Sequence, residues 1–470
     1  MSSNTKAIAK LKKKYSKWPW ETGLTGFKNW LLQKLPAFFI LFFLRNILVE
    51  SDYKLKREST KFFKYSNTAY GANKRRSCDR LLVIAFALID RHFDVSYVVL
   101  MRNAVQSTLN KSRRRSELSE NILEATKRLE ISTLDATGWY QLSRGLFSIG
   151  YFRAAWVARE NSLDLSISEG TTLGSSVTAV SRAIEAHLER LELNSVRKVL
   201  SENIVLGPKK LDSYRESLGL LEPNFASNSG GAIGKDGVAE KFFYVLVNGK
   251  RVVLVGPGHP RGEYGDEIDS ADTVARVKFV GTENLPAQKF HGSRCNIAYQ
   301  PALDVLAKYV NLGVNIDYYE KIDLFVSGNE LSKFGTKPVL NIETSIPMYR
   351  TTAVSGIILL FHLIRAAPRK LTVYGFDFRA ARKQYSNEAR DFYKINSPLI
   401  GGPYPGFDSE DLSEYIIAYD FCEHDFVSNF CFAQNLYKAG LFDIEPYGKS
   451  ILELTPYQYV ERLEEMLGDW

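Results

Sequence analysis

Two short apolar runs that each end in a glycine constrain the fold of this chain more than any other feature. One run is Arg251–Val255, followed by Gly256, and the other is 372–374, followed by Gly375. The second run comes after an apolar segment long enough for a helix. Because strands that alternate with helices form parallel sheets, we predict an α/β domain. Ligands of such sheets bind beyond the carboxyl ends of the strands, so we expect the chemistry in the loops after the two runs.

The chain ahead of this domain has a different pattern. With 470 residues it is long enough for two or three domains. Residues 53–205 carry apolar side chains at spacings of three and four, and the segment 138–155 resembles the register of tetratricopeptide-type helical hairpins. We expect an all-α, helical-repeat-like domain there, which serves either as a docking surface or as a packing module. Residues 206–240 are predicted to be a linker, and 241–470 the α/β domain.

The N-terminal arm, residues 1–52, begins the most basic part of the chain. Residues 1–80 hold 18 Lys and Arg against 5 Asp and Glu, so with a formal charge of +8 the rest of the chain is net negative. This predicts a local anionic partner such as a phospholipid surface, and no nucleic acid. The apolar run 35–44 is about half of the ~20 residues that a membrane-spanning helix needs. We expect it either to lie in the membrane interface or to be a buried hydrophobic helix.

The cysteines indicate a reducing compartment. Cys78, Cys295, Cys422 and Cys431 have neither CxxC spacing nor the density of a disulfide scaffold, and they do not resemble a metal site. No small-residue cleavage site follows the apolar run, so we expect no secretory signal. We therefore expect a cytoplasmic protein that lies peripherally on the inner membrane through residues 1–50.

The first segment that carries chemistry is 252–279. Gly256, Pro257 and Gly258 form a glycine-rich turn whose backbone can approach a phosphate, and the next strand carries two cations, Arg276 and Lys278. GxGxxG and GK[ST] are both absent, so the turn is neither a dinucleotide fingerprint nor a Walker loop.

This segment resembles the large sialyl motif of the sialyltransferases of glycosyltransferase family 29. In that motif a V-G-N-S-G turn precedes Y-G-x-x-I-D-x-x-D-x-V-x-R-x-N, and the matching positions are Tyr264, Gly265, Ile268, Asp269, Asp272, Val274 and Arg276. The resemblance implies that the turn, Arg276 and Lys278 contact the nucleotide donor. Pro257 and Lys278 replace two motif asparagines that help hold phosphate and ribose. Because a proline has no N–H to donate, we expect the donor geometry to differ here.

The second segment is 349–378. Ser355 and Gly356 open the predicted apolar helix, and its first N–H groups can face a sugar carboxylate or a phosphate. The following strand ends in Gly375, Phe376 and Asp377. This pattern resembles the small sialyl motif of family 29, and equally the S-G helix and G-x-D-F strand end of the bacterial sialyltransferases of family 42. The resemblance makes Ser355, Gly356, Gly375 and Asp377 donor contacts.

The third segment, 415–429, supplies a candidate base. Inverting transfer needs a group that removes the acceptor hydroxyl proton, and we predict His424 in this role. In family 29 the catalytic histidine precedes a glutamate by five positions. Here Asn429 stands at that position, so Asp425 or Glu423 is expected to orient the imidazole.

Two further residues are catalytic candidates. His259 is the rival of His424, because a histidine in the glycine-rich turn could protonate the leaving group. Tyr419 is predicted to donate to the leaving phosphate, a role that family 42 assigns to tyrosines.

Together the three segments imply a Rossmann-like glycosyltransferase domain preceded by the helical domain. The expected activity is inverting transfer of a sialic acid or a related ulosonate such as Kdo from a CMP-activated donor, without cofactor or metal. The expected acceptor is a surface polysaccharide, a lipopolysaccharide or a lipid-linked oligosaccharide. One alternative is a helical-repeat adaptor with a degenerate nucleotide-binding domain. Another is an α/β enzyme that uses a different nucleotide sugar.

Overall fold

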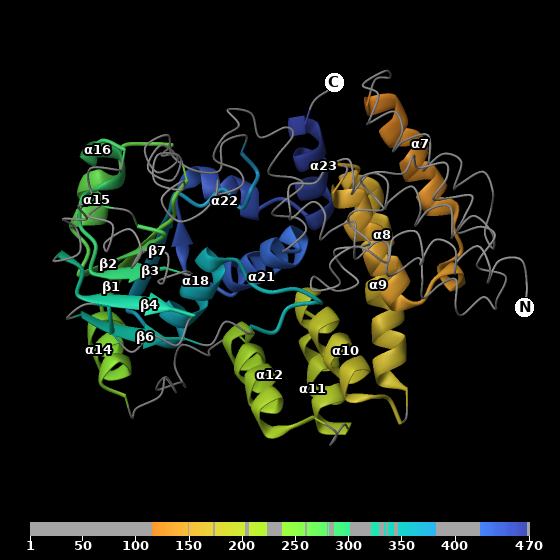
Figure 1. The fold of residues 1–470 in the computed structure, drawn as a ribbon, viewed down its shortest axis with the longest axis horizontal. Coiled ribbons are helices and arrows are strands. Elements are labelled where there is room, and N and C mark those ends of the chain that lie inside the picture. The colour runs from red at the N-terminus through yellow and green to blue at the C-terminus, as the bar shows by residue number, and fades with distance from the viewer. Residues whose placement is uncertain are drawn as a thin grey trace, which may run out of the picture. The chain divides into compact units, whose positions relative to one another are not determined.

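The computed structural model covers the helical region and the α/β domain (Figure 1). The described residues are 115–148, 150–172, 174–202, 206–222, 237–258, 261–279, 281, 286–300, 321–328, 333–334, 337–342, 346–381 and 424–467. The basic arm with the apolar run 35–44, residues 53–114 of the expected helical domain, His259 and Tyr419 lie outside them. Within these ranges, no helix has the length and apolar character required to cross a membrane.

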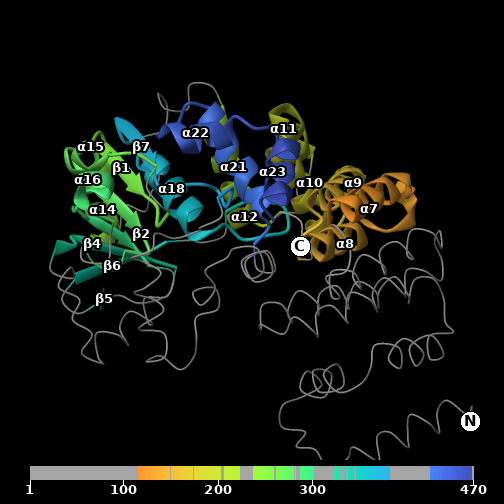
Figure 2. The same cartoon turned by 90° about the horizontal axis from the view of Figure 1, so that it is seen from above.

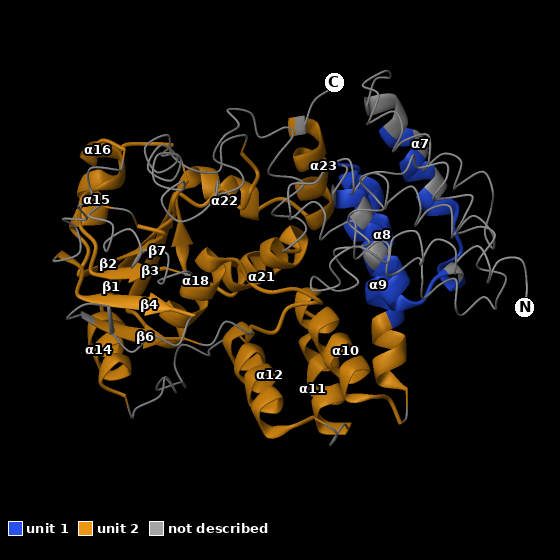
Figure 3. Ribbon diagram, in the orientation of Figure 1, with its two compact units in different colours: residues 1–165, 417–422, 467–470 blue, residues 166–416, 423–466 orange. Residues whose placement is uncertain are grey.

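The chain divides into two compact units (Figure 3). One comprises 1–165, 417–422 and 467–470, and the other comprises 166–416 and 423–466. The division falls inside helix α9 (Phe152–Thr171), well ahead of the boundary expected at 205.

The first unit buries the aromatic residues of the segment 138–155. Its helices are α7 (Arg115–Arg128), η2 (Ile131–Thr133), α8 (Ala136–Ser148) and the first part of α9. Trp139 is fully buried, and its indole N–H donates to the carbonyl of Ile131 at 2.8 Å. Ser162 donates to the carbonyl of Ala136 at 2.5 Å and ties α9 to α8. The small and aromatic register therefore builds a helical core here, while a repeat architecture and a docking role remain predictions.

Three helices that precede the sheet in sequence belong to the second unit. They are α10 (Val177–Glu189), α11 (Leu193–Glu202) and α12 (Pro208–Leu221). Consecutive helices of this set contact each other, and α10 and α12 also contact α21 (Phe426–Lys438). Asn435 of α21 donates to the carbonyls of Leu188 and Glu189 at 3.1 and 3.0 Å. The helical hairpin predicted around 186–200 is present as α10 and α11.

Part of the predicted linker is helical. Residues Pro208–Leu221 form α12, with Gly207 as N-cap and Pro208 in the first turn, and α14 (Val238–Val247) begins before the linker was expected to end. Proline is favoured at the first position of a helix because its missing N–H would have no partner there. The Gly-Pro pair thus marks a helix start rather than a flexible segment.

The sheet has the order β5-β6-β4-β3-β2-β1-β7-β8. Its strands are β1 (Arg251–Val255), β2 (Thr273–Val277), β3 (Ile297–Tyr299), β4 (Leu324–Ser327), β5 (Lys333–Phe334), β6 (Lys337–Asn341), β7 (Lys370–Tyr374) and β8 (Asp443–Ile444). All pairs are parallel except β5 with β6. The central strands are buried almost throughout, as expected of parallel strands covered on both faces. The parallel α/β prediction is confirmed.

The strand order reverses at β1. Strands β2, β3, β4 and β6 follow on one side of β1, and β7 and β8 on the other, so β1 and β7 flank the switch point of the sheet. Their register pairs Val255 with Tyr374, which brings the two predicted loops together at one edge. The remaining helices are α15 (Gly265–Asp269), α16 (Gln288–His291), α18 (Ser355–Arg365), α22 (Pro446–Leu452) and α23 (Pro456–Leu467). Figure 2 shows α18 close to β7, with α21 and α22 on the same side.

Candidate functional site

The glycine-rich turn after β1 packs on the loop after β7. The N–H of Gly256 donates to the carbonyl of Tyr374 at 2.8 Å, and the N–H of Gly258 donates to the carbonyl of Gly375 at 3.3 Å. A Cβ atom at either glycine would lie 2.5 Å from the Gly375 oxygen, so neither position has room for a side chain. Pro257 has no N–H. The glycines therefore allow two backbones to meet, and the turn does not offer these amides to a phosphate, contrary to the sequence-based interpretation.

Phe376 lies where the turn meets α18. A Cβ atom on Gly256 would come within 2.7 Å of the Phe376 ring, and one on Gly356 would also overlap the ring. The predicted convergence of the first and second segments is thus present, because both glycines pack on the same side chain. However, the half-buried ring fills part of the space in which a ligand was expected.

The start of α18 is held by α21. The N–H of Val354, the N-cap residue, donates to the side-chain oxygen of Asn429 at 2.8 Å, and the side-chain nitrogen of Asn429 donates to the Asp425 carbonyl at 2.8 Å. Asn429, which departs from the family glutamate, thus positions the helix that begins at Ser355. The first N–H groups of a helix have no acceptor within it, so this end of α18 keeps the capacity for an anion.

His424 faces the segment that leads into α18. Its Nδ1 lies 3.1 Å from the carbonyl oxygen of Thr352 and 3.4 Å from the Thr352 hydroxyl. A neutral imidazole that donates from Nδ1 to a carbonyl carries its lone pair on Nε2, the form required of a base. Asp425 or Glu423 was expected to orient this ring, and Glu423 lies outside the described residues. The carboxylate of Asp425 caps α21 by accepting from the N–H groups of Val427 and Ser428 at 3.0 and 3.1 Å.

The side chain of Arg276 is buried and hydrogen-bonded to the backbone. Its side chain is 2% exposed, Nε donates to the carbonyl of Arg294 at 2.7 Å, and Nη2 donates to the carbonyl of His291 at 2.6 Å. Its guanidinium is thus buried against the 291–294 turn and donates within the fold, and the predicted contact of Arg276 with a donor phosphate stays a prediction. Lys278 follows β2 in a left-handed conformation, with φ of 55°, and its N–H donates to the carbonyl of Tyr299 at 2.8 Å.

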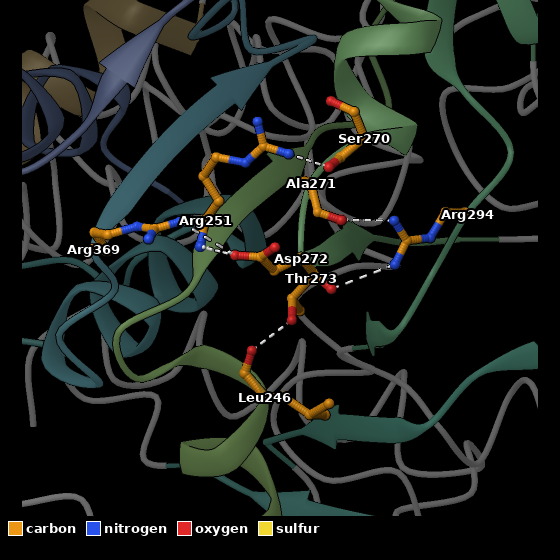
Figure 4. A network of polar contacts seen from close by, with 8 residues as sticks. All are labelled: Leu246, Arg251, Ser270, Ala271, Asp272, Thr273, Arg294 and Arg369. Carbon is orange, nitrogen blue, oxygen red and sulfur yellow. Dashed lines mark hydrogen bonds and ion pairs between the residues drawn. The ribbon is translucent and has the colours of Figure 1, made fainter.

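The motif aspartates also have structural partners. Asp269 accepts from the N–H groups of Ser293 and Arg294 at 2.9 and 3.0 Å. Partial burial of this carboxylate is outweighed by these bonds, which hold its pKa below the usual value. Asp272 accepts from the N–H of Arg251 at 2.8 Å, and the guanidinium of Arg294 donates to the carbonyl of Ala271 at 2.6 Å (Figure 4). These hydrogen bonds to backbone groups give a structural reason for the aspartates that match the large sialyl motif.

The loop after β7 is strained and anchored. Phe378 and Arg379 have φ values of 49° and 68°, a left-handed conformation that is uncommon for residues with a Cβ atom. The hydroxyl of Tyr459 donates to the Phe378 carbonyl at 2.5 Å, and that of Tyr447 donates to the Ala380 carbonyl at 3.0 Å. Such strain persists only where the surroundings fix it, and it is common at functional sites.

Asp377 lies in this loop at the switch point. Burial raises the pKa of its carboxyl to about 6, although the Arg379 N–H at 2.9 Å and the charges of Arg379 and Arg261 act in the opposite direction. A carboxyl group that titrates near neutral pH at such an edge is a candidate functional group. It can bind a sugar hydroxyl, but when ionised it repels a phosphate.

The structure adds a cluster that the sequence did not reveal. The guanidinium of Arg261 lies 4.4 Å from the centre of the Tyr447 ring, and that of Arg462 lies 5.9 Å from it. Nη2 of Arg462 also lies 3.4 Å from the Tyr447 hydroxyl. Arg261 stands inside the first predicted segment but matches no motif position, and Arg462 is far away in sequence, so no local signal connects them.

No metal site and no relative adds to this picture. Within the described ranges, no group of three or more His, Cys, Asp or Glu is placed to hold a metal ion. Comparisons with protein-family models, with curated proteins and with solved structures find no match to the chain.

Proposed function

We propose that this protein is an inverting glycosyltransferase that takes a sialic acid or a related ulosonate, such as Kdo, from a CMP-activated donor. One observation carries the proposal: the loops after β1 and β7 meet at the switch point of a parallel sheet, where α/β proteins bind their ligands. The start of α18 packs at the same place through Gly356 and Phe376. The imidazole of His424 is bonded to Thr352, three residues before that helix.

The proposed reaction is a direct in-line displacement. Nε2 of His424 takes the proton of the acceptor hydroxyl while its oxygen forms a bond to the anomeric carbon. The bond from that carbon to the phosphate oxygen breaks, and CMP leaves with the electron pair. The N–H groups at the start of α18 stabilise negative charge on the sugar carboxylate or the departing phosphate.

The acceptor and the location belong to the same proposal. A basic, aromatic arm ahead of residue 53 suits a protein that works on a lipid-linked oligosaccharide or a lipopolysaccharide at the cytoplasmic side of the inner membrane. The ligands are then the CMP-sugar and a glycan or glycolipid, and the reaction needs no metal.

A donor screen tests the proposal. The full chain is incubated with CMP-sialic acid, CMP-Kdo, UDP-sugars and GDP-sugars, and nucleotide release and product mass are measured. We expect release of CMP alone, unchanged by a chelator. Turnover of a UDP- or GDP-sugar would assign a different donor, and loss of activity with the chelator would contradict the metal-free mechanism.

The adaptor remains the second candidate because of one observation. The Phe376 ring occupies space between Gly256 and Gly356, and a degenerate nucleotide site would have this property. Absence of both turnover and CMP binding in the donor screen would favour it.

A further inference from the structure

A phosphate at the switch point needs a partner other than the glycine-rich turn. The N–H groups of Gly256 and Gly258 already donate to carbonyls of the β7 segment, and Pro257 has none. Arg276 is buried and donates to two carbonyls. Besides the N–H groups at the start of α18, a phosphate at this edge can therefore draw on positive charge from other side chains.

Three neighbouring loops bring such side chains together. Arg261 lies in the loop after β1, Asp377 and Arg379 in the loop after β7, and Tyr447 just after β8. These strands are neighbours and parallel, so their carboxyl ends share one edge. Arg462 joins the group from α23 through the Tyr447 hydroxyl.

The geometry of Arg261 suits an anion. The carbon of its guanidinium group lies over the Tyr447 ring, 4.4 Å from the ring centre, and the residue is exposed. A cation–π contact occupies no hydrogen-bond acceptor, so Arg261 can still donate to a second partner. Among the described residues, no carboxylate lies within salt-bridge distance of Arg261, whereas Arg365 pairs with Glu216. Tyr447 itself is fixed by its bond to Ala380, so the platform is preorganised.

Arg462 contributes a second cation with spare donors. Its Nε is buried and has no hydrogen-bond partner in the described part of the chain, and Nη2 makes only a long contact of 3.4 Å with Tyr447. A buried donor without an acceptor costs free energy, which a bound oxyanion would recover.

Two carboxyl groups accompany these arginines. Near Tyr447 the described residues include two guanidinium groups, those of Arg261 and Arg462, and the carboxylate of Glu445, which accepts from the Tyr447 N–H. The charge of Arg261 also acts on the carboxyl group of Asp377. Burial raises the pKa of both carboxyl groups, to about 6 for Asp377, so their negative charge is easily reduced. When these two carboxyl groups are protonated, the cluster carries the positive charge of Arg261 and Arg462, and a phosphate would make bidentate contacts with these arginines.

We propose that Arg261 and Arg462, placed by Tyr447, form the binding site for the phosphate of the substrate. The inference rests on the proposed function for the identity of that substrate, a CMP-sugar. The arginine cluster itself is a phosphate site whichever nucleotide carries the group.

Ligands with and without a phosphate group test this site. Affinities of the full chain for CMP, for cytidine and for inorganic pyrophosphate are measured by calorimetry, with the wild type and with Arg261→Gln and Arg462→Gln. Each variant is expected to bind CMP and pyrophosphate about tenfold more weakly, with little change for cytidine. Arg261→Lys should recover part of the loss. The matched control is Arg369→Gln, which removes an exposed arginine just before β7, at the opposite edge of the sheet, and should change none of the affinities.

The outcomes separate the two proposals. Unchanged affinity for CMP and pyrophosphate in both glutamine variants would refute the arginine site, as would a wild type that binds neither ligand. If the wild type binds pyrophosphate, loses it in the variants, and fails to bind CMP, the phosphate site stands and the CMP-sugar proposal fails. Circular dichroism of each variant identifies any loss that comes from unfolding.

Discussion

Two arginine-containing clusters of one sheet differ in how their guanidinium groups are satisfied. We call Asp269, Asp272, Arg276 and Arg294 the motif network, and Arg261, Asp377, Arg379, Tyr447 and Arg462 the carboxyl-edge cluster. In the motif network, guanidinium groups donate to backbone carbonyls at 2.6–2.7 Å. In the carboxyl-edge cluster, two of them lie on the ring of Tyr447.

The difference teaches how a motif match should be interpreted. The motif network matches the large sialyl pattern, yet its donors are used within the fold. The carboxyl-edge cluster matches no pattern, yet it retains donors at the edge where ligands bind. A shared register can therefore preserve a fold element rather than a ligand contact. The predictions below, ordered from the largest expected effect, test this contrast.

Arg276→Met should have the largest effect, on stability. It leaves the carbonyls of His291 and Arg294, in a partly buried turn, without these donors, at a cost of about 1–3 kcal/mol each, so we expect a loss of about 3 kcal/mol in the free energy of unfolding. Urea denaturation measures it, with Arg261→Gln as the comparison, for which we expect about 0.5 kcal/mol or less. If the Arg276→Met protein is as stable as the wild type but binds CMP more weakly, Arg276 contacts the ligand after all.

His424→Ala tests whether the chemistry lies on the carboxyl side of the sheet. Removal of a general base should lower turnover by ~10²-fold, equivalent to ~2.7 kcal/mol in the activation barrier. Steady-state kinetics should show a lower kcat with little change in the donor KM. His187→Gln in α10 is the control, since His187 pairs with Glu192 instead. A folded His424→Ala protein with normal turnover would transfer the role to His259.

Asp377→Asn should change the pH dependence of stability. The pKa of Asp377 is raised to about 6 by burial, so the folded chain binds this proton more tightly than the unfolded chain, whose carboxyl titrates near pH ~4. The stabilising effect of protonation is complete below pH ~4 and is lost as the pH rises through about 6. When the pH is raised from ~5 to ~7.5, the free energy of unfolding of the wild type should fall by on the order of 1–2 kcal/mol relative to that of the variant. Parallel pH profiles of the two proteins would show Asp377 to be accessible to water.

Arg369→Gln should have the smallest effect. Arg369 and Asp272 are 3.7 Å apart with side chains 69% and 42% exposed, and such pairs contribute about 0–1 kcal/mol. We expect a change below about 0.5 kcal/mol, because Asp272 keeps its bond to the Arg251 N–H. A larger decrease in the free energy of unfolding, measured by thermal or urea denaturation, would show that the exposed pair of Arg369 and Asp272 stabilises the motif network.

The sequence determined the elements whose signals are local. The strand Arg251–Val255, the strand before Gly375 and the helix that begins at Ser355 were all predicted where the structure has them. Apolar run length, a following glycine and an S-G helix start are properties of neighbouring residues, so a single chain segment displays them. The parallel sheet followed from their alternation.

Only the tertiary structure decided how the loops use their residues. Gly256 and Gly356 are glycines because the Phe376 ring lies against both, and Arg261 meets Arg462 on Tyr447 across a long stretch of chain. The same holds for Arg276, a cation in the sequence that became a buried donor in the fold. Sequence patterns record which groups a segment carries. Contacts between distant segments decide whether an arginine donates to a backbone carbonyl or can still bind a ligand. These contacts form only when the sheet is assembled.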